Sequence, residues 1–356
     1  SDYPVIDNYL IKNQKYPDMS EVKRYINKDN FENFLRGYLK KDDVLITLVG
    51  NGIGNVTMAP SNKSVIVQNT IGLRTNKNAS NTFLYYLLLF YQDEIKNFNR
   101  GTSQPSIKKT DLFNLAIQIS PLEEQKAIAH ILSTLDEKIE VNNQINKTLE
   151  NMAQAMFKQW FVDFEFPNED GEPYKSSGGE MVESELGMIP KGWAASNVLQ
   201  NIIEEKEKNK QMNDYPVLSV VKEGKFVLSD EYFNKQVYSK NTKNYKVIRK
   251  NSVGYNPARA NIGSIAMLRE YEAGLLSPIY KVFRLKESIL PSYFYYYMRR
   301  DTFIEKIKHY SSGTTRQNFD FNAFEEFELI KPPTGIQKEF ESIVTSLESC
   351  IKHNNN

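Results

Sequence analysis

The sequence has few of the residues that disulfides, metal sites and catalytic triads require. Its 356 residues include one cysteine, Cys350, and three histidines, His130, His309 and His353, which are far apart in the chain. A single thiol excludes an intramolecular disulfide and is consistent with the reducing cytoplasm, where we expect the protein to reside. The scattered histidines suggest no metal site and leave no Ser/His/Asp or Cys/His arrangement. No stretch approaches the ~18 apolar residues that a membrane-spanning helix needs.

The net charge is only +1, which by itself argues against a nucleic-acid ligand. The charges are unevenly distributed, however. Residues 235–316 contain 9 Lys and 7 Arg against 5 acidic residues, a balance of 16 − 5 = +11. Residues 120–186 contain 5 Lys against 14 acidic residues, a balance of 5 − 14 = −9. A basic block is typical of a surface that binds a phosphate backbone, although a solvated Lys/Arg surface would give the same count.

An internal repeat determines the organisation of the chain. "DYPVID" at residues 2–7 recurs as "DYPVLS" at 214–219, and "GTSQ" at 101–104 recurs as "GTTR" at 313–316, both at an offset of 212. Pro121 and Gln125 recur as Pro333 and Gln337 at the same offset. Between these matches the offset slips to 209, so the loops differ while the frame is kept. The chain therefore contains two copies of one unit.

Each copy is predicted to be a globular segment followed by a long helix. Short β-rich runs such as "DVLITLV" and "YKVFRL" alternate with aromatic helical stretches such as "FLYYLLLFYQDEIKNF". This mixture favours an α+β or α/β class. The tyrosines of these stretches could stack on bases, but at helical spacing they are more typical of a core.

Residues 121–161 are predicted to form one helix of about 60 Å, at 1.5 Å per residue. Ser120 suits the N-cap and Glu123 completes a capping box. Apolar residues then recur in alternating steps of three and four, with Asn142 and Asn146 in the seam, which indicates a coiled coil. The second copy begins the same seam in the order Ile336, Phe340, Ile343, Leu347 and Ile351. We expect the two helices to pair within the chain rather than to pack separately on their own domains.

The resulting domain prediction has five parts. The first copy has no counterpart of residues 187–212, and the second stops at Asn356, the counterpart of Gln144. We therefore expect a first domain without its head and a shortened second helix. The predicted parts are a first domain at 1–119, its helix at 120–165, a polar linker at 166–186, a second domain at 187–331 and its helix at 332–356.

The sequence argues against three enzymatic functions. "VLITLVGNGIGNV", residues 44–56, resembles the start of a phosphate-binding loop, but its glycines give G-x-G-x-G and a strand-like run follows where a helix is needed. The "NPAR" of residues 256–259 lacks the second proline and the aromatic residue of an amino-methyltransferase motif. The "PD" and "EVK" of residues 17–23 are too close together for a nuclease metal site, and they do not recur. A turn facing a DNA groove explains the glycines better.

The segment "SPLEEQKAIAHILSTLDEKIEVNNQINKTLENMAQAMFKQWFVDFEFP" resembles the specificity (S) subunits of type I restriction-modification systems. Their first conserved helix typically opens with P-L-x-E-Q-x-x-I-A and ends with F-x-x-W-F-V-D-F, and both patterns are present here. "GMIPKGW" and "GTTRQNF" are similar to the opening and the closing loop of the family's target-recognition domain. The resemblance spans essentially the whole chain, except for the missing head and the shortened second helix.

This resemblance implies a subunit that recognises DNA and performs no chemistry. It implies two target-recognition domains related by a pseudo-two-fold, held apart by long antiparallel coiled-coil helices, each reading half of a bipartite double-stranded site. Two methyltransferase subunits would dock through the helices, and motor-nuclease subunits would join for cleavage. S-adenosylmethionine, ATP and Mg²⁺ are expected only on those partners. The alternative is an assembly or decoy protein that binds methyltransferase subunits without reading DNA.

The candidate DNA contacts are donor-bearing residues of the predicted loops. Arg suits guanine and Asn or Gln suit adenine, so Arg259, Asn261 and Gln104 are the expected base readers. Lys108, Lys109 and the Gly-Thr loops are the expected phosphate contacts. The full set comprises Thr47, Asn51, Asn55, Arg100, Thr102, Ser103, Gln104, Lys108, Lys109, Tyr255, Asn256, Arg259, Asn261, Thr314, Thr315, Arg316 and Gln317.

Overall fold

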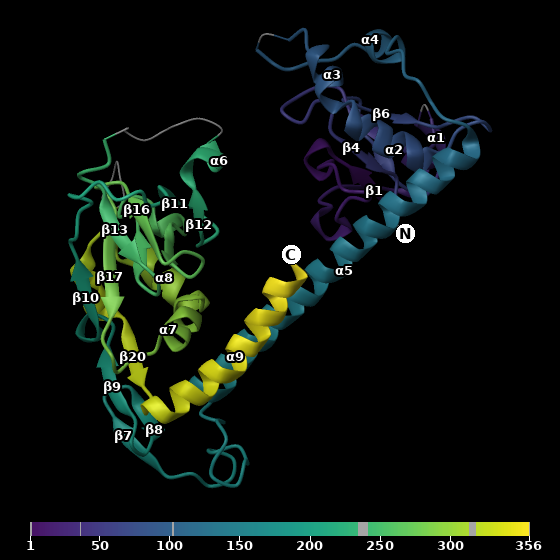
Figure 1. The fold of residues 1–356 in the computed structure, drawn as a ribbon. Helices are drawn as coiled ribbons and strands as arrows, with labels where there is room; N and C mark the ends of the chain where they lie inside the picture. The colour runs from purple at the N-terminus through teal and green to yellow at the C-terminus, as the bar shows by residue number, and fades with distance from the viewer. Residues whose placement is uncertain (1, 36, 102, 234–240, 313–317, 356) are drawn as a thin grey trace. The chain divides into compact units, whose positions relative to one another are not determined.

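The computed structural model describes residues 2–35, 37–101, 103–233, 241–312 and 318–355, which form two compact units (Figure 1). Unit 1 is Ser1–Asn143 and unit 2 is Gln144–Asn356. The division falls inside helix α5 (Leu122–Phe161), so residues 122–143 of this helix belong to unit 1 and residues 144–161 belong to unit 2. Among the described helices, none combines the length and the apolar character that crossing a membrane would require.

Unit 1 contains two small sheets and short helices around the start of α5. The sheet orders are β2-β1-β5 and β4-β3-β6. The strands are β1 (Tyr3–Ile6), β2 (Tyr25–Ile26), β3 (Val44–Thr47), β4 (Val56–Met58), β5 (Val65–Ile66) and β6 (Thr70–Leu73). The helices before α5 are η1 (Asn8–Leu10), η2 (Met19–Glu21), α1 (Lys28–Asn33), α2 (Asn81–Phe90), α3 (Gln92–Asn97) and α4 (Lys109–Phe113).

Unit 2 is built around a four-stranded sheet of order β10-β17-β14-β15, with five two-stranded pairs around it in the described residues. The sheet strands are β10 (Ile202–Glu205), β14 (Val253–Tyr255), β15 (Ile265–Met267) and β17 (Lys281–Leu285). The pairs are β7 (Met181–Ser184) with β8 (Gly187–Pro190), β9 (Ala194–Asn197) with β20 (Glu328–Lys331), β11 (Leu218–Val220) with β12 (Phe226–Leu228), β13 (Lys246–Arg249) with β16 (Ala273–Leu276), and β18 (Ser311–Ser312) with β19 (Asn318–Phe319). The helices are η3 (Leu199–Asn201), α6 (Ser229–Phe233), η4 (Ala260–Ile262), α7 (Pro291–Met298), α8 (Asp301–His309), η5 (Phe321–Glu326) and α9 (Thr334–Asn354).

The same three-stranded antiparallel arrangement, with its first strand in the middle, is present in both units. The order β4-β3-β6 in unit 1 corresponds to β15-β14-β17 in unit 2. Val44 faces Met58 and Val253 faces Met267, and both partners are shifted by one offset, 253 − 44 = 209 and 267 − 58 = 209. The strands are short and rich in buried β-branched residues, which suits a sheet covered on both faces. The predicted mixed class with two duplicated domains is confirmed.

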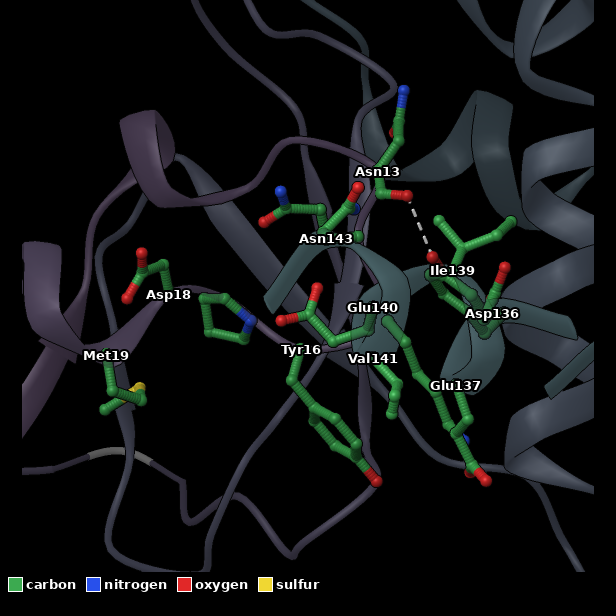
Figure 2. Close-up of a pocket in the computed structure, with 14 residues that line it drawn as sticks. Asn13, Tyr16, Asp18, Met19, Asp136, Glu137, Ile139, Glu140, Val141 and Asn143 are labelled. Atoms are coloured by element: carbon green, nitrogen blue, oxygen red, sulfur yellow. Dashed lines mark hydrogen bonds and ion pairs between the residues drawn. The ribbon is translucent and has the colours of Figure 1, made fainter. Parts of the chain in front are cut away.

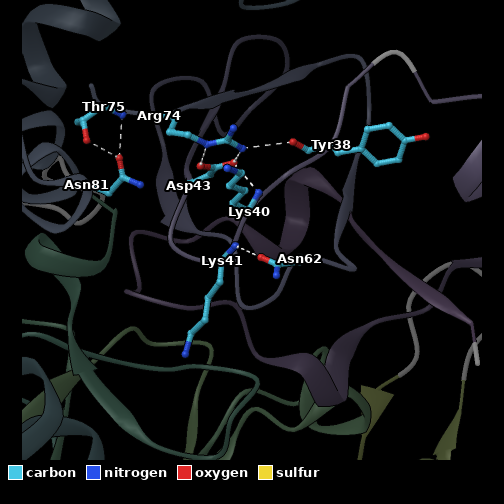
Figure 3. A network of polar contacts seen from close by, with 8 residues as sticks. All are labelled: Tyr38, Lys40, Lys41, Asp43, Asn62, Arg74, Thr75 and Asn81. Carbon is cyan, nitrogen blue, oxygen red and sulfur yellow. Dashed lines mark hydrogen bonds and ion pairs between the residues drawn. The ribbon is translucent and has the colours of Figure 1, made fainter. Parts of the chain in front are cut away.

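An ion pair between a buried carboxylate and a partly exposed arginine joins the start of β3 to the end of β6 in unit 1 (Figure 3). The carboxylate of Asp43, at the start of β3, accepts two hydrogen bonds from Arg74, at 2.7 Å from Nε and 2.5 Å from Nη2. It also accepts the backbone N–H of Lys40 at 2.7 Å. Each carboxylate oxygen therefore has a hydrogen-bond donor, which a polar group that is only 2% exposed requires.

Helices α5 and α9 run antiparallel within unit 2, as predicted. Phe340 near the start of α9 packs against Trp160 near the end of α5, at 5.9 Å between ring centroids. At the other end of the pair, Asn146 donates to Asn355 and accepts from Asn354, both at 2.8 Å. The prediction that Asn146 is a polar residue in the seam between the helices is therefore confirmed. Opposed amides of this kind favour one register over apolar alternatives.

The predicted capping box at the start of α5 does not form. The Ser120 hydroxyl is buried and makes no hydrogen bond among the described residues, and Glu123 pairs with Lys126 instead. The contact between the first turn of α5 and Ser120 is made instead by Gln125, whose side-chain amide donates to the Ser120 carbonyl at 2.7 Å.

The segment predicted as a linker, residues 166–186, is folded. Phe166 is buried and stacks on Tyr174 and Trp193, at centroid distances of 4.6 and 5.0 Å. Strands β7 and β8 then form a hairpin. Although this stretch is mostly polar, its aromatic residues Phe166 and Tyr174 pack in the core of unit 2.

Candidate DNA interface

In each unit a glycine-bearing turn joins an inner strand to the neighbouring edge strand, β3 to β4 in unit 1 and β14 to β15 in unit 2. In unit 1 the β3–β4 turn has Gly50 and Gly54 at φ values of 103° and 75°, and in unit 2 the β14–β15 turn has Gly263 at 101°. These angles lie in the left-handed region that glycine adopts without strain. A Cβ on Gly263 would also lie 2.1 Å from the Lys222 carbonyl oxygen. The glycines of "GNGIG" therefore shape a tight turn, and nucleotide binding is not needed to explain them.

A second loop is fixed beside this turn by the same main-chain hydrogen bond in both units. The Ile107 N–H donates to the Leu48 carbonyl at 2.8 Å, and the Phe319 N–H donates to the Pro257 carbonyl at 3.0 Å. The partners are repeat counterparts, because 319 − 107 = 212 and 257 − 48 = 209. We call each combination a paired loop: residues 48–55 with 103–107 in unit 1, and residues 257–263 with 318–319 in unit 2.

Six of the predicted contacts are exposed on or beside the paired loops and form no ion pair among the described residues. The Arg259 guanidinium has no side-chain partner among the described residues, so its donors are available. Arg100 is exposed too, but it donates to Asp111 at 2.8 Å, and Asn261 is half-buried. The exposed six are Asn51, Ser103, Gln104, Lys108, Lys109 and Arg259.

Four predicted contacts have structural roles instead. Thr47 and Tyr255 are 0% exposed, and both hydroxyls are enclosed without a hydrogen-bond partner in the described structure. Asn256 is 8% exposed, and its side chain accepts the Ala258 N–H to shape the turn. Asn55 donates to the Ile11 carbonyl at 3.1 Å. We withdraw Thr47 and Tyr255 as DNA contacts because they are buried, and Asn256 and Asn55 because their side chains hydrogen-bond to the backbone of the protein.

The remaining predicted contacts, Thr102, Thr314, Thr315, Arg316 and Gln317, lie outside the described residues.

Acidic residues from outside the basic block neutralise much of its charge. Glu204 pairs with Lys281 at 2.8 Å, and Glu207 pairs with Arg249 at 2.8 Å. The same holds for further pairs, Lys306–Glu328 and Arg269–Glu348. Counting charges in a sequence window missed these partners, so the balance of +11 overstates the local field. Arg259 is one of the exposed basic residues of the block that form no ion pair among the described residues.

A shallow cleft of about 550 Å³ adjoins the unit 2 turn and was not foreseen. Asn261 and Gly263 line it together with three cations from other elements, Lys222, Arg299 and Lys308. Arg299 also lies 3.9 Å from Glu150 of α5. The "MRR" of residues 298–300 had been treated only as part of an aromatic helix, although a basic pair at a helix end was a usable signal.

A larger cleft, of about 810 Å³ in unit 1, is unsuited to a phosphate backbone (Figure 2). It lies between residues 13–19 and α5, and its charged lining is mostly acidic. Asp136, Glu137 and Glu140 stand on the α5 side, and Asp18 stands opposite. Within the described chain, no cluster of three or more His, Cys, Asp or Glu side chains could hold a metal ion.

Comparison with known proteins assigns the family. The chain matches the family described as "Type I restriction modification DNA specificity domain" over residues 1–151 and 197–356. The chain belongs to this family, and its role is that of a specificity subunit.

Curated relatives agree with this assignment. The type I restriction enzyme MjaIX specificity subunit of Methanocaldococcus jannaschii is 25% identical over 99% of this chain and 82% of its own length. The HindI specificity subunit of Haemophilus influenzae is 32% identical over 42% of this chain, a match that spans only 34% of that protein. The crystal structure of the type I restriction-modification S subunit from M. genitalium superposes on this chain with a TM-score of 0.55 and 16% sequence identity. The superposition covers 100% of this chain and 88% of that subunit, so the two share a fold.

Proposed function

We propose that each unit reads one half of a bipartite double-stranded DNA site with its paired loop. One observation carries this proposal: both copies hold the turn and the neighbouring loop together through an equivalent main-chain hydrogen bond, Ile107–Leu48 and Phe319–Pro257. Duplicated units with matched exposed loops suit two half-sites, which lie about 34 Å apart when they are read from one face of B-DNA. The chain itself catalyses nothing in this proposal.

Different residues of the paired loops make different contacts. Arg259 and Gln104 are exposed and read base edges, since Arg pairs with guanine and Gln with adenine. Lys108 and Lys109 precede and begin α4, where they contact phosphates. Asn261 lines the cleft beside Lys222 and reaches DNA from the side of the turn.

The decisive variant for base reading is Arg259→Ala. It should weaken binding to the specific site by ~1–3 kcal/mol and relax one base position, because a bidentate contact is lost. Arg249→Ala is the matched control: it removes an exposed Arg of the same block that already pairs with Glu207. Binding titrations and sequencing of methylated positions would measure both effects. An unchanged site preference in Arg259→Ala would remove this residue from the interface.

The same titrations separate the proposal from the alternative of a methyltransferase-binding protein that does not read DNA. Sequence-dependent binding, with or without partner subunits, supports reading by this chain. Binding to methyltransferase subunits with no preference among DNA sequences would support the alternative.

We further propose that methyltransferase subunits dock on the exposed face of α5, and that S-adenosylmethionine, ATP and Mg²⁺ are bound by the partner subunits. Ile131, Leu135 and Ile139 lie one turn apart on α5 in unit 1 and are 62%, 53% and 59% exposed. Three large apolar residues in one stripe are costly to leave in water, and such stripes mark protein interfaces. Family membership supports a methyltransferase subunit as the occupant.

Leu135→Glu tests this docking surface. It should lower methyltransferase binding at least tenfold, because a charge would be buried in an apolar contact. His130→Glu introduces the same charge on the same helix, about 140° around the axis, and should have little effect. Pull-down with a purified methyltransferase subunit gives the measurement. Equal losses in both variants would argue against a contact through this stripe.

A further inference from the structure

Each recognition domain is attached to its long helix by two polar contacts that the repeat preserves. The first uses Gln125 and Gln337, which are both 0% exposed and are counterparts at 337 − 125 = 212. A fully buried glutamine in the first turn of a surface helix needs partners for both ends of its amide. In both units it finds them in the neighbouring recognition domain and in the residues just before the helix.

The two glutamines make the same three hydrogen bonds. The Gln125 oxygen accepts the N–H of Ser80, the N-cap of α2, at 3.1 Å, and its amide donates to the carbonyls of Asn78 and Ser120. The Gln337 oxygen accepts the N–H of Leu290, the N-cap of α7, at 2.8 Å. Its amide donates to the Ser288 and Pro332 carbonyls at 3.0 and 2.8 Å. Each partner is the repeat counterpart of the other, at 288 − 78 = 290 − 80 = 210 and 332 − 120 = 212.

The second contact joins a tyrosine of the aromatic helix to a carboxylate of the long helix. The Tyr86 hydroxyl donates to Asp136 at 2.7 Å, and the Tyr296 hydroxyl donates to Glu348 at 3.1 Å. These are again counterparts, at 296 − 86 = 210 and 348 − 136 = 212. Nothing in the sequence marks this pair, because the acid is Asp in one copy and Glu in the other.

The spacing of the two contacts places both of them on one face of the long helix. On each long helix they are 11 residues apart, 136 − 125 = 348 − 337 = 11. At 1.5 Å and 100° per residue, that places them about 16 Å apart and within about 20° of one another around the axis. Two anchors on one face of a helix restrain the tilt of the domain along that helix, which a single anchor cannot do.

We propose that these contacts, Gln125 with Asp136–Tyr86 and Gln337 with Glu348–Tyr296, form a two-point clamp that sets the angle at which each recognition domain sits on its own helix. The residues of the clamp are positioning residues. In DNA reading, which rests on the proposed function, the clamp fixes where each paired loop meets its half-site and hence which spacer length is accepted.

The native Cys350 allows a direct test in unit 2. It is free and exposed on α9, so a spin label there and a second on Asn244→Cys, an exposed position of the recognition domain, report the angle between domain and helix. Gln337→Met should broaden the distance distribution, Tyr296→Phe should broaden it less because Arg269 still donates to Glu348 at 2.5 and 2.6 Å, and their combination should broaden it most. Thermal melts of the same samples show that the variants remain folded.

Tyr297→Phe is the matched control. This hydroxyl is also buried, but it donates to the Glu328 carbonyl inside the recognition domain, at 2.6 Å. Its loss should lower the melting temperature about as much as Tyr296→Phe while leaving the distance distribution narrow. A distribution as narrow in Tyr296→Phe and Gln337→Met as in the unaltered clamp would overturn the proposal, as would equal broadening in Tyr297→Phe.

A DNA measurement separates this inference from the proposed function. Tyr296→Phe combined with Tyr86→Phe should let the chain accept spacers longer or shorter than the preferred one. Broadened distances with an unchanged spacer preference would support the clamp and count against spacer selection by the two units. Narrow distances would overturn the clamp whatever the DNA result.

Discussion

The two units carry the same clamp but differ in the apolar packing around it. In unit 2 the clamp adjoins a large aromatic cluster, in which Phe340 of α9 contacts Phe157, Trp160 and Phe161 of α5. In unit 1 the counterpart of Phe340 is Ile128, which is only half-buried, since 340 − 128 = 212. The difference shows that the polar contacts belong to the repeated unit, whereas the aromatic cluster depends on two helices lying together.

The carboxylate of the unit 2 clamp has an additional partner, Arg269. Glu348 accepts two hydrogen bonds from Arg269, at 2.5 and 2.6 Å, in addition to that from Tyr296. Arg269 lies over the ring of Tyr295 at 4.5 Å. No arginine pairs with Asp136 among the described contacts of unit 1. A planar guanidinium held by a carboxylate and a ring adds directional restraint.

The largest expected effect comes from truncating the aromatic cluster. Phe340→Ala should destabilise unit 2 by ~3–5 kcal/mol, the usual cost of removing a fully buried Phe. Ile128→Ala, at the equivalent place in unit 1, should cost about 1 kcal/mol because the side chain is half-buried. Urea unfolding monitored by tryptophan fluorescence reports on unit 2, where both Trp160 and Trp193 are buried, and far-UV circular dichroism of the same samples adds unit 1, which has no tryptophan. Similar losses at the two positions would contradict the asymmetry.

A smaller effect should distinguish the DNA contacts of the two units. Lys108 and Lys109 of unit 1 correspond to Asp320 and Phe321 in unit 2, at the offset of 212. Lys109→Ala should therefore weaken binding to all DNA sequences and reduce the slope of log affinity against log salt by about 1. Phe321→Ala gives the comparison in unit 2 and should leave the slope unchanged. A Lys109→Ala slope equal to that of the unaltered chain would exclude a phosphate contact there.

The smallest effect at neutral pH concerns the tyrosines of the clamps. Burial first, and then the neighbouring carboxylate, raise the pKa of both Tyr86 and Tyr296 above the ordinary 10.0. The folded state therefore holds these protons more tightly than the unfolded state does, so the stabilisation is complete below pH 10 and declines as pH rises above it. Tyrosinate absorbance should show one fewer late-titrating group in Tyr86→Phe and in Tyr296→Phe. An unchanged titration curve in either variant would contradict the assignment.

The repeat made most of the architecture predictable from sequence. Matches at offsets of 209 and 212 indicated equivalent turns, and the heptad pattern with Asn146 in its seam indicated the helix pair. The burial of individual polar residues near the turn was not predictable, because Thr47 and Asn51 are both small polar residues of one glycine-bearing stretch. Thr47 is the last residue of β3, whose four residues are all buried, while Asn51 lies in the exposed turn. Charge compensation was equally hidden, since Glu204 and Glu207 lie outside the basic window that they neutralise.

The main-chain bonds between Leu48 and Ile107, and between Pro257 and Phe319, have one more consequence. These bonds use only peptide groups, so the loop framework does not require a particular side chain at Asn51, Gln104 or Arg259. Substitutions at such positions can accumulate while the backbone keeps its path. Related chains could therefore diverge in the base sequence they select without having to evolve a new scaffold.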